Sequence, residues 1–136
     1  MANVDAFDYR ASDAFRLEAS KIMLAPADAT YNLIRIPKFA FVTDVWIQII
    51  SGFTLNASVV VGWMGNKEVA NEDGFIDNGL ADPLVPGFKR SFNVAAGTFP
   101  AKYFSAAGGA ITATVLDNLG AVGNFRVFAS FVVIVE

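Results

Sequence analysis

The chain is dominated by segments in which apolar and polar residues alternate with the period of a β-strand. From residue 31 onward these segments are rich in aromatic and β-branched residues, and glycine, proline, asparagine and aspartate lie between them. Residues 39–50 read FAFVTDVWIQII, and residues 125–135 read FRVFASFVVIV. Six to eight short strands punctuated in this way predict an all-β fold, an antiparallel β-sandwich of the jelly-roll type.

Consecutive segments of this pattern favour antiparallel pairing. Residues 39–50 and 54–63 are predicted to form one pair, and a turn is predicted at Gly65–Asn66. Residues 110–117 and 125–135 are predicted to form a hairpin, because the loop NLGAVGN between them contains two glycines. The last strand becomes apolar on both faces in its second half, so it is expected either to be central in its sheet or to meet another subunit.

The N-terminal part of the chain has a different composition. Residues 1–30 hold about a third of all charged residues, and we interpret them as an arm that precedes a sandwich domain of residues 31–136. Phe15, Ala19 and Ile22 are spaced as on a helix, whereas Phe15, Leu17 and Ala19 alternate as on a strand. Both conformations of this segment remain open from the sequence.

The chain has more apolar residues than an ordinary soluble domain of its size. On the count that includes glycine but not tyrosine, the apolar share is about 60%, against roughly 45–50% in soluble domains. No uninterrupted apolar run reaches the roughly 20 residues of a transmembrane helix, so no membrane partner is expected. The surplus of apolar residues predicts that apolar side chains are buried between identical subunits. The expected interface residues lie on residues 39–50 and 128–135: Val42, Trp46, Ile50, Phe128, Val132 and Ile134.

The composition also excludes several kinds of chemistry. The chain contains no histidine and no cysteine, which rules out serine–histidine and cysteine–histidine catalysis and thiolate metal sites. The formal net charge of −3 does not favour a nucleic-acid partner, because affinity for phosphate backbones comes mainly from lysine and arginine. We therefore expect no enzymatic activity and no cofactor.

The densest acidic cluster lies in NEDGFIDNGLADP, residues 71–83. Asp73 and Asp77 are weak candidates for a calcium site, since their spacing does not follow the alternation of an EF-hand loop. The favoured interpretation is a long connecting loop over residues 71–87, in which aspartate and asparagine cap turns. Phe75, Ile76 and Leu80 are expected to fold inward and anchor this loop. The tryptophans Trp46 and Trp63, with Tyr103, offer an alternative as a glycan-binding rim.

The order of several short motifs resembles small virion proteins of tailed bacteriophages. RIPKFAFVTDVWIQI (35–49) resembles their I-P-x-x-x-x-V-x-D-V-x-[VI] strand, and Asp73–Asp77 resembles their DGF[LI]D loop. The glycine-containing loop before the final strand GNFRVFASFVVIVE is similar too. The resemblance covers roughly residues 31–136, and the arm matches only through the RASD of Arg10–Asp13.

This resemblance implies a jelly-roll subunit, usually trimeric, that decorates or cements the outside of a capsid without enzymatic activity. The implied partners are further copies of the chain and the major capsid protein. The implied location is the capsid surface of the virion, after synthesis in the host cytoplasm. Alternatives are the glycan-binding tip or adhesin module of a tail fibre, and a neck or tail-completion protein. The residues expected to contact the shell are in the arm: Phe7, Tyr9, Arg10, Phe15 and Arg16.

Overall fold

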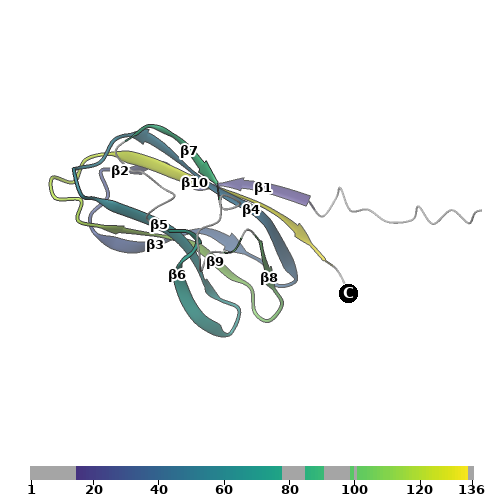
Figure 1. The fold of residues 1–136 in the computed structure, drawn as a ribbon. Coiled ribbons are helices and arrows are strands. Elements are labelled where there is room, and N and C mark those ends of the chain that lie inside the picture. Colours follow the sequence, from purple (N-terminus) through teal and green to yellow (C-terminus); the bar gives the residue numbers. More distant parts are fainter. Residues whose placement is uncertain (1–14, 78–84, 91–98, 100, 135–136) are drawn as a thin grey trace, which may run out of the picture.

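A computed structural model describes residues 15–77, 85–90, 99 and 101–134, and these residues form two antiparallel β-sheets packed face to face (Figure 1). The strands are β1 (Phe15–Ala19), β2 (Met23–Leu24), β3 (Ala29–Ile36), β4 (Ala40–Ser51), β5 (Ser58–Gly65), β6 (Glu68–Ile76), β7 (Gly87–Arg90), β8 (Lys102–Phe104), β9 (Gly109–Leu116) and β10 (Asn124–Val133). The predicted all-β sandwich is therefore confirmed.

The strand order is that of a jelly roll. The six-stranded sheet has the order β1-β10-β4-β7, with β2 also paired to β10 and β8 to β4. The four-stranded sheet has the order β3-β9-β5-β6. The chain passes repeatedly from one sheet to the other, and the last strand returns to pair with the first, as two interlocked Greek keys require. β10 lies between β1 and β4, so it is central in its sheet, which is one of the two predicted outcomes.

The two predicted antiparallel pairs are wrong. β4 and β5 lie in opposite sheets, and so do β9 and β10. The loops that follow β4 and β9 cross between the sheets at the same end of the sandwich, where the Thr54 hydroxyl donates to the Asp117 carbonyl (3.2 Å) and accepts from the Leu119 amide (3.1 Å). Phe53 is buried under this crossing, against Phe125. Loops of this length span the roughly 10 Å between packed sheets.

Among the described strands, β5 and β6 form a hairpin at the predicted turn. Asn66 and Lys67 both have positive φ, 57° and 54°, as a two-residue type I′ turn requires. The buried Asn66 side chain also holds β8 and the segment after it, because its amide nitrogen donates to the Tyr103 carbonyl of β8 (3.2 Å) and its oxygen accepts from the Ala106 amide (2.9 Å). Lys102 donates to Glu68 at 2.6 Å, and this hydrogen bond is the main reason that the pKa of Glu68 lies below its usual value.

A β-bulge in β4 reverses the faces of that strand part-way along. Ser130 pairs with Asp44 and Phe131 pairs with Val42, so Thr43 is an extra residue without an opposite partner. Val42 is fully buried in the core, and the expectation that it lies in a subunit interface is wrong. Phe41 takes its place on the outer face, where it is 38% exposed.

The acidic segment is also differently built from the prediction. Residues 71–76 are the second half of strand β6, so they are not a connecting loop. Phe75 and Ile76 are fully buried in the core, and Leu80 lies outside the described residues. The core of the sandwich is otherwise made of the inward side chains of both sheets, of which the largest include Phe104, Phe125 and Phe131.

The second half of the predicted arm is part of the sandwich. Residues 15–19 form strand β1, not a helix, and pair antiparallel with β10 from Phe15 opposite Val132 to Ala19 opposite Phe128. β2 also pairs with β10. The boundary predicted at residue 30 falls inside β3. Of the expected shell contacts, Phe7, Tyr9 and Arg10 lie outside the described residues.

The Asn118 side chain ties the loop after β9 to the segment between β2 and β3. It is only 5% exposed, and its amide nitrogen donates to the carbonyls of Pro26 (2.9 Å) and Val122 (2.8 Å). We expect Asn118→Ala to lower the free energy of unfolding by about 3 kcal/mol, because buried carbonyls lose their donors. Urea denaturation measures this loss. The exposed Asn32→Ala variant is the control, and an equal loss in both variants would contradict the assignment.

Candidate subunit interface

The outer face of the six-stranded sheet carries an apolar row across four strands. Phe15 of β1 is opposite Val132 of β10, Val132 is opposite Phe41 of β4, and Phe41 is opposite Tyr103 of β8. Directly opposite residues in a sheet point to the same face and contact one another. We call these four residues the Phe41 row. Phe15 and Phe41 are 52% and 38% exposed, so the row offers apolar surface to a partner.

An aromatic cluster lies further along the same face. Trp46 of β4 and Phe128 of β10 are directly opposite, and their rings stack with centroids 5.4 Å apart and planes 9° apart. Phe88 of β7 approaches Phe128 with ring centroids 6.3 Å apart, and it is 59% exposed. We call Trp46, Phe88 and Phe128 the Trp46 cluster. Its surface is hollowed between Trp46, Phe88 and Arg90.

Arginine residues frame the Trp46 cluster. The Arg90 guanidinium lies 6.0 Å from the Trp46 ring and forms an ion pair with Asp44. The Arg126 guanidinium lies 4.9 Å from the Phe128 ring and donates to the Gln48 side chain (2.8 Å). Tryptophan, phenylalanine and arginine are enriched in protein–protein interfaces, where a ring of polar groups surrounds an apolar centre.

A polar line separates the two apolar areas. The hydroxyls of Thr43, at the bulge, and Ser130, on β10, are 2.7 Å apart. Leu17 of β1 is opposite Ser130 and 62% exposed, so it extends the apolar surface to the edge of the sheet. The Thr43–Ser130 pair therefore lies between the Phe41 row and the Trp46 cluster on this face.

Comparison with solved structures finds the same fold in two bacteriophage capsids. One matching chain belongs to the "acidic stable" capsid structure of the Helicobacter pylori bacteriophage KHP30, with a TM-score of 0.61, 15% identity, and coverage of 88% of this chain and 87% of that chain. The other belongs to the capsid asymmetric unit of the cyanophage Pam1, with a TM-score of 0.61, 13% identity, and coverage of 98% of this chain and 94% of that chain. No protein-family model and no curated protein sequence matches the chain. These similarities establish the fold across nearly the whole chain.

The structure brings several of the expected interface residues onto one face. Trp46, Phe128 and Val132 lie on the outer face of the six-stranded sheet, and Ile50 lies at a second bulge near the end of β4, 36% exposed. Ile134 follows β10 and is 44% exposed. Val42, as described above, belongs to the core.

Other residues of this face were not expected from the sequence. Phe41 was not among the expected interface residues, because the bulge at Thr43 that turns it outward cannot be read from alternation. Phe88 was missed because its segment FKRSFNV is half polar, and only the pairing of Phe88 with Gln48 brings it beside Phe128. Phe15, expected to contact a shell, belongs to the Phe41 row. Arg16 is opposite the inward-facing Phe131 and is exposed at the sheet edge.

The remaining candidates from the sequence are placed as follows. Trp63 is 4% exposed and packs against Phe75 and Phe99, so it presents no free ring face for a sugar. Asp73 lines a surface hollow together with Glu72, and Asp77 does not line that hollow. Within the described residues, no three or more acidic residues gather as a metal-binding group. The same residues include no helix long and apolar enough to cross a membrane.

Proposed function

We propose that this chain is a structural protein of a bacteriophage particle, and more specifically a homotrimeric decoration or cement protein on the capsid surface. The observation that carries the proposal is the jelly-roll fold shared over nearly the whole chain with chains of two phage capsids. A jelly roll also occurs in lectins and enzymes, so the fold alone does not decide the function. The outer face of the six-stranded sheet supplies the second argument.

That face is suited to contact with copies of the same chain. The Phe41 row and the Trp46 cluster join exposed aromatic and aliphatic side chains from β1, β10, β4, β7 and β8. Large exposed apolar patches on soluble proteins mark interaction sites, because water does not solvate them favourably. In a trimer, each subunit would cover this face of its neighbour, and the arginine–aspartate pair Arg90–Asp44 would lie at the rim.

The N-terminal arm gives the proposed contact with the shell. β1 leads directly from residues 1–14 into the edge of the six-stranded sheet, next to the Phe41 row. We propose that the residues before β1 contact a neighbouring subunit or the major capsid protein. We propose a mechanical role without catalysis or cofactor, in which the protein ties adjacent shell subunits together.

The glycan-binding alternative has one observation in its favour. The hollow between Trp46, Phe88 and Arg90 combines aromatic rings with a charged group beside Asp44, as sugar sites often do. Against it, the Trp46 ring is already stacked on Phe128, which occupies one of its two faces. A glycan array of the purified protein tests this alternative directly.

Electron microscopy of particles made with and without the protein tests the proposal. We expect density at regular positions on the outside of the shell that disappears when the gene is deleted, and we expect particles without the protein to rupture at lower temperature and at higher external osmotic strength than particles that carry it. Density at the neck or tail, with an unchanged shell, would instead support a neck or tail-completion protein. Particles indistinguishable with and without the protein would overturn a structural role.

A further inference from the structure

One side of the sandwich is open, where strands β1 and β3 form the two rims of a groove. Among the described strands, β1 pairs only with β10 and β3 pairs only with β9, so each has one unpaired edge. Residues of both strands line the groove between them, which has a volume of about 330 Å³. An unpaired edge presents main-chain N–H and C=O groups to which a strand of another chain can bond.

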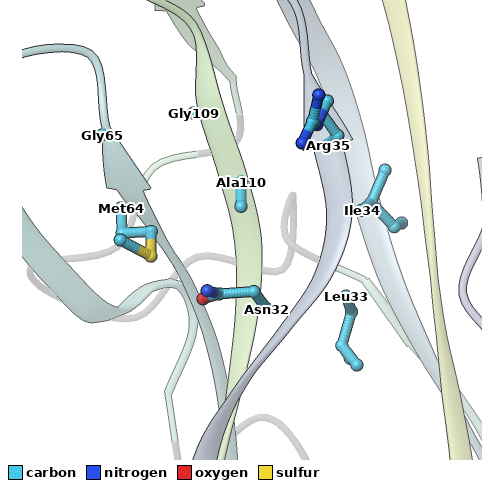
Figure 2. A pocket seen from close by; sticks show the side chains of 8 residues that line it. All are labelled: Asn32, Leu33, Ile34, Arg35, Met64, Gly65, Gly109 and Ala110. Carbon is cyan, nitrogen blue, oxygen red and sulfur yellow. The ribbon is translucent and has the colours of Figure 1, made fainter.

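A β-bulge in β3 brings apolar side chains to this groove. Leu33 has no opposite partner on β9, because the pairing shifts by one residue between Asn32 and Ile34. Figure 2 shows Asn32 reaching across β9 towards Met64, over a second hollow, while Leu33 and Ile34 lie on the other side of β3. Leu33, Ile34 and Arg35 line the groove, which therefore combines apolar surface with a guanidinium group.

Strand β1 presents alternate side chains to the groove and to the outer face. Arg16 and Glu18 line the groove, whereas Phe15 and Leu17 lie on the outer face, and all five residues of the strand are exposed. Neither Arg16 nor Arg35 has an ion-pair partner in the part of the chain that the structure describes. The open edge therefore offers two free cations, one carboxylate and an apolar strip to a partner strand.

We propose that residues 7–10 of a second copy of this chain pair in parallel with β1 and extend the six-stranded sheet. The inference rests on the proposed assembly of identical copies. Residues 7–10 read FDYR, and the first four residues of β1 read FRLE. The opposite pairs would be Phe7 with Phe15, Asp8 with Arg16, Tyr9 with Leu17 and Arg10 with Glu18. Two of these pairs are apolar and two join opposite charges, which are the cross-strand combinations that stabilise a sheet.

The partner strand has to come from another copy. Parallel strands of one chain need a crossover of about a dozen residues or more, and only residues 11–14 lie between Arg10 and Phe15. Within one chain, residues 7–10 could meet β1 only as an antiparallel hairpin. No antiparallel register satisfies both charges of β1, because placing Arg10 opposite Glu18 puts Ser12 opposite Arg16.

The added strand would complete features that the structure leaves open. Asp8 would lie at the groove that Arg16 and Arg35 line, so that its carboxylate faces both free cations. On the outer face, Phe7 would extend the Phe41 row by one residue, and Tyr9 would cover Leu17, which is 62% exposed. A contact in which each copy gives its arm to the next is heterologous, and it closes as a ring in a trimer.

Disulfide trapping between two kinds of full-length chain tests this pairing, because the chain contains no cysteine of its own. Chains with Tyr9→Cys are co-expressed with chains that carry Leu17→Cys and a longer affinity tag, and the purified protein is oxidised. We expect a disulfide-linked product with one chain of each kind, since directly opposite Cβ atoms lie near disulfide range. Tyr9→Cys with Val69→Cys is the control, because Val69 is 91% exposed on the other sheet.

Charge reversal tests the direction of the added strand. Arg10→Glu in the Tyr9→Cys chain should lower the yield of the mixed product about threefold, and Glu18→Arg in the Leu17→Cys chain should restore it. In an antiparallel contact with Tyr9 opposite Leu17, Arg10 would face Arg16, so the same reversal would raise the yield.

Two outcomes overturn the inference. One is a mixed product no more abundant than in the Val69→Cys control, which is also the result expected of a hairpin within one chain. The other is an Arg10→Glu variant whose yield is unchanged or higher. Light scattering of the same samples separates this failure from that of the proposed assembly. A trimeric mass without the mixed product removes only the arm contact, and a monomeric mass removes both.

Discussion

On the proposed trimeric assembly, the Phe128→Glu variant is expected to be a monomer under conditions in which the wild-type protein assembles. Phe128 lies at the centre of the Trp46 cluster, stacked on Trp46 and next to Phe88. Aromatic residues at the centre of an interface commonly contribute about 2 kcal/mol or more each, and a buried carboxylate adds a further penalty. A threefold interface repeats the change at every contact, so dissociation should be complete.

Light scattering coupled to size-exclusion chromatography measures this outcome. The wild type should give three times the 14.5 kDa of one chain, and Phe128→Glu should give the mass of a single chain. Val69→Glu is the matched control, because Val69 is 91% exposed on β6 of the other sheet and receives the same charge. Circular dichroism should show that both variants keep the sandwich, since a glutamate at position 128 lies beside Arg126. A wild type of 14.5 kDa would remove the trimer proposal.

Where the pairing between strands has no bulge, the sequence predicts correctly which side chains of a strand face the core and which face outward. In β10 the alternation places Val127, Ala129 and Phe131 inward and Phe128 outward, as the structure has them. In β4 the same reasoning fails for Phe41 and Val42, which precede Thr43, because one extra residue reverses the faces there. The position of a bulge depends on which residues of the neighbouring strand lie opposite. The sequence of one strand does not show that pairing.

Connectivity was harder to predict for a related physical reason. The breaks after β4 and β9 contain the glycines and polar residues expected of hairpin loops, yet both loops cross to the other sheet. The deciding contacts are non-local: Thr54 with Asp117 and Leu119, and the burial of Phe53 against Phe125. For the candidate interface, Trp46 and Phe128 were found from strand faces, whereas Phe88 joined them only through the pairing of β7 with β4.

Phe75→Ala is expected to cause a large loss of stability. Phe75 is fully buried and packs edge-on against Trp63, with ring centroids 5.2 Å apart and planes 68° apart. It follows directly on a β-bulge in β6, so its ring anchors the point at which β6 returns to regular pairing with β5. Removing a buried aromatic side chain leaves a cavity as well as losing the transfer free energy of the ring. We expect the free energy of unfolding to fall by about 4 kcal/mol, and the melting temperature by roughly 10–15 °C.

The control for this prediction is a variant that removes an exposed apolar side chain. Leu119→Ala removes a side chain that is 77% exposed on the crossing loop, and it should cost less than about 1 kcal/mol. Urea denaturation of both variants at one protein concentration measures the difference, because any assembly makes stability depend on concentration. Equal losses would mean that Phe75 does not hold β6 against the core. A loss confined to Phe75→Ala would show that the segment predicted as a loop is instead a structural strand whose bulge is fixed by the aromatic pair beneath it.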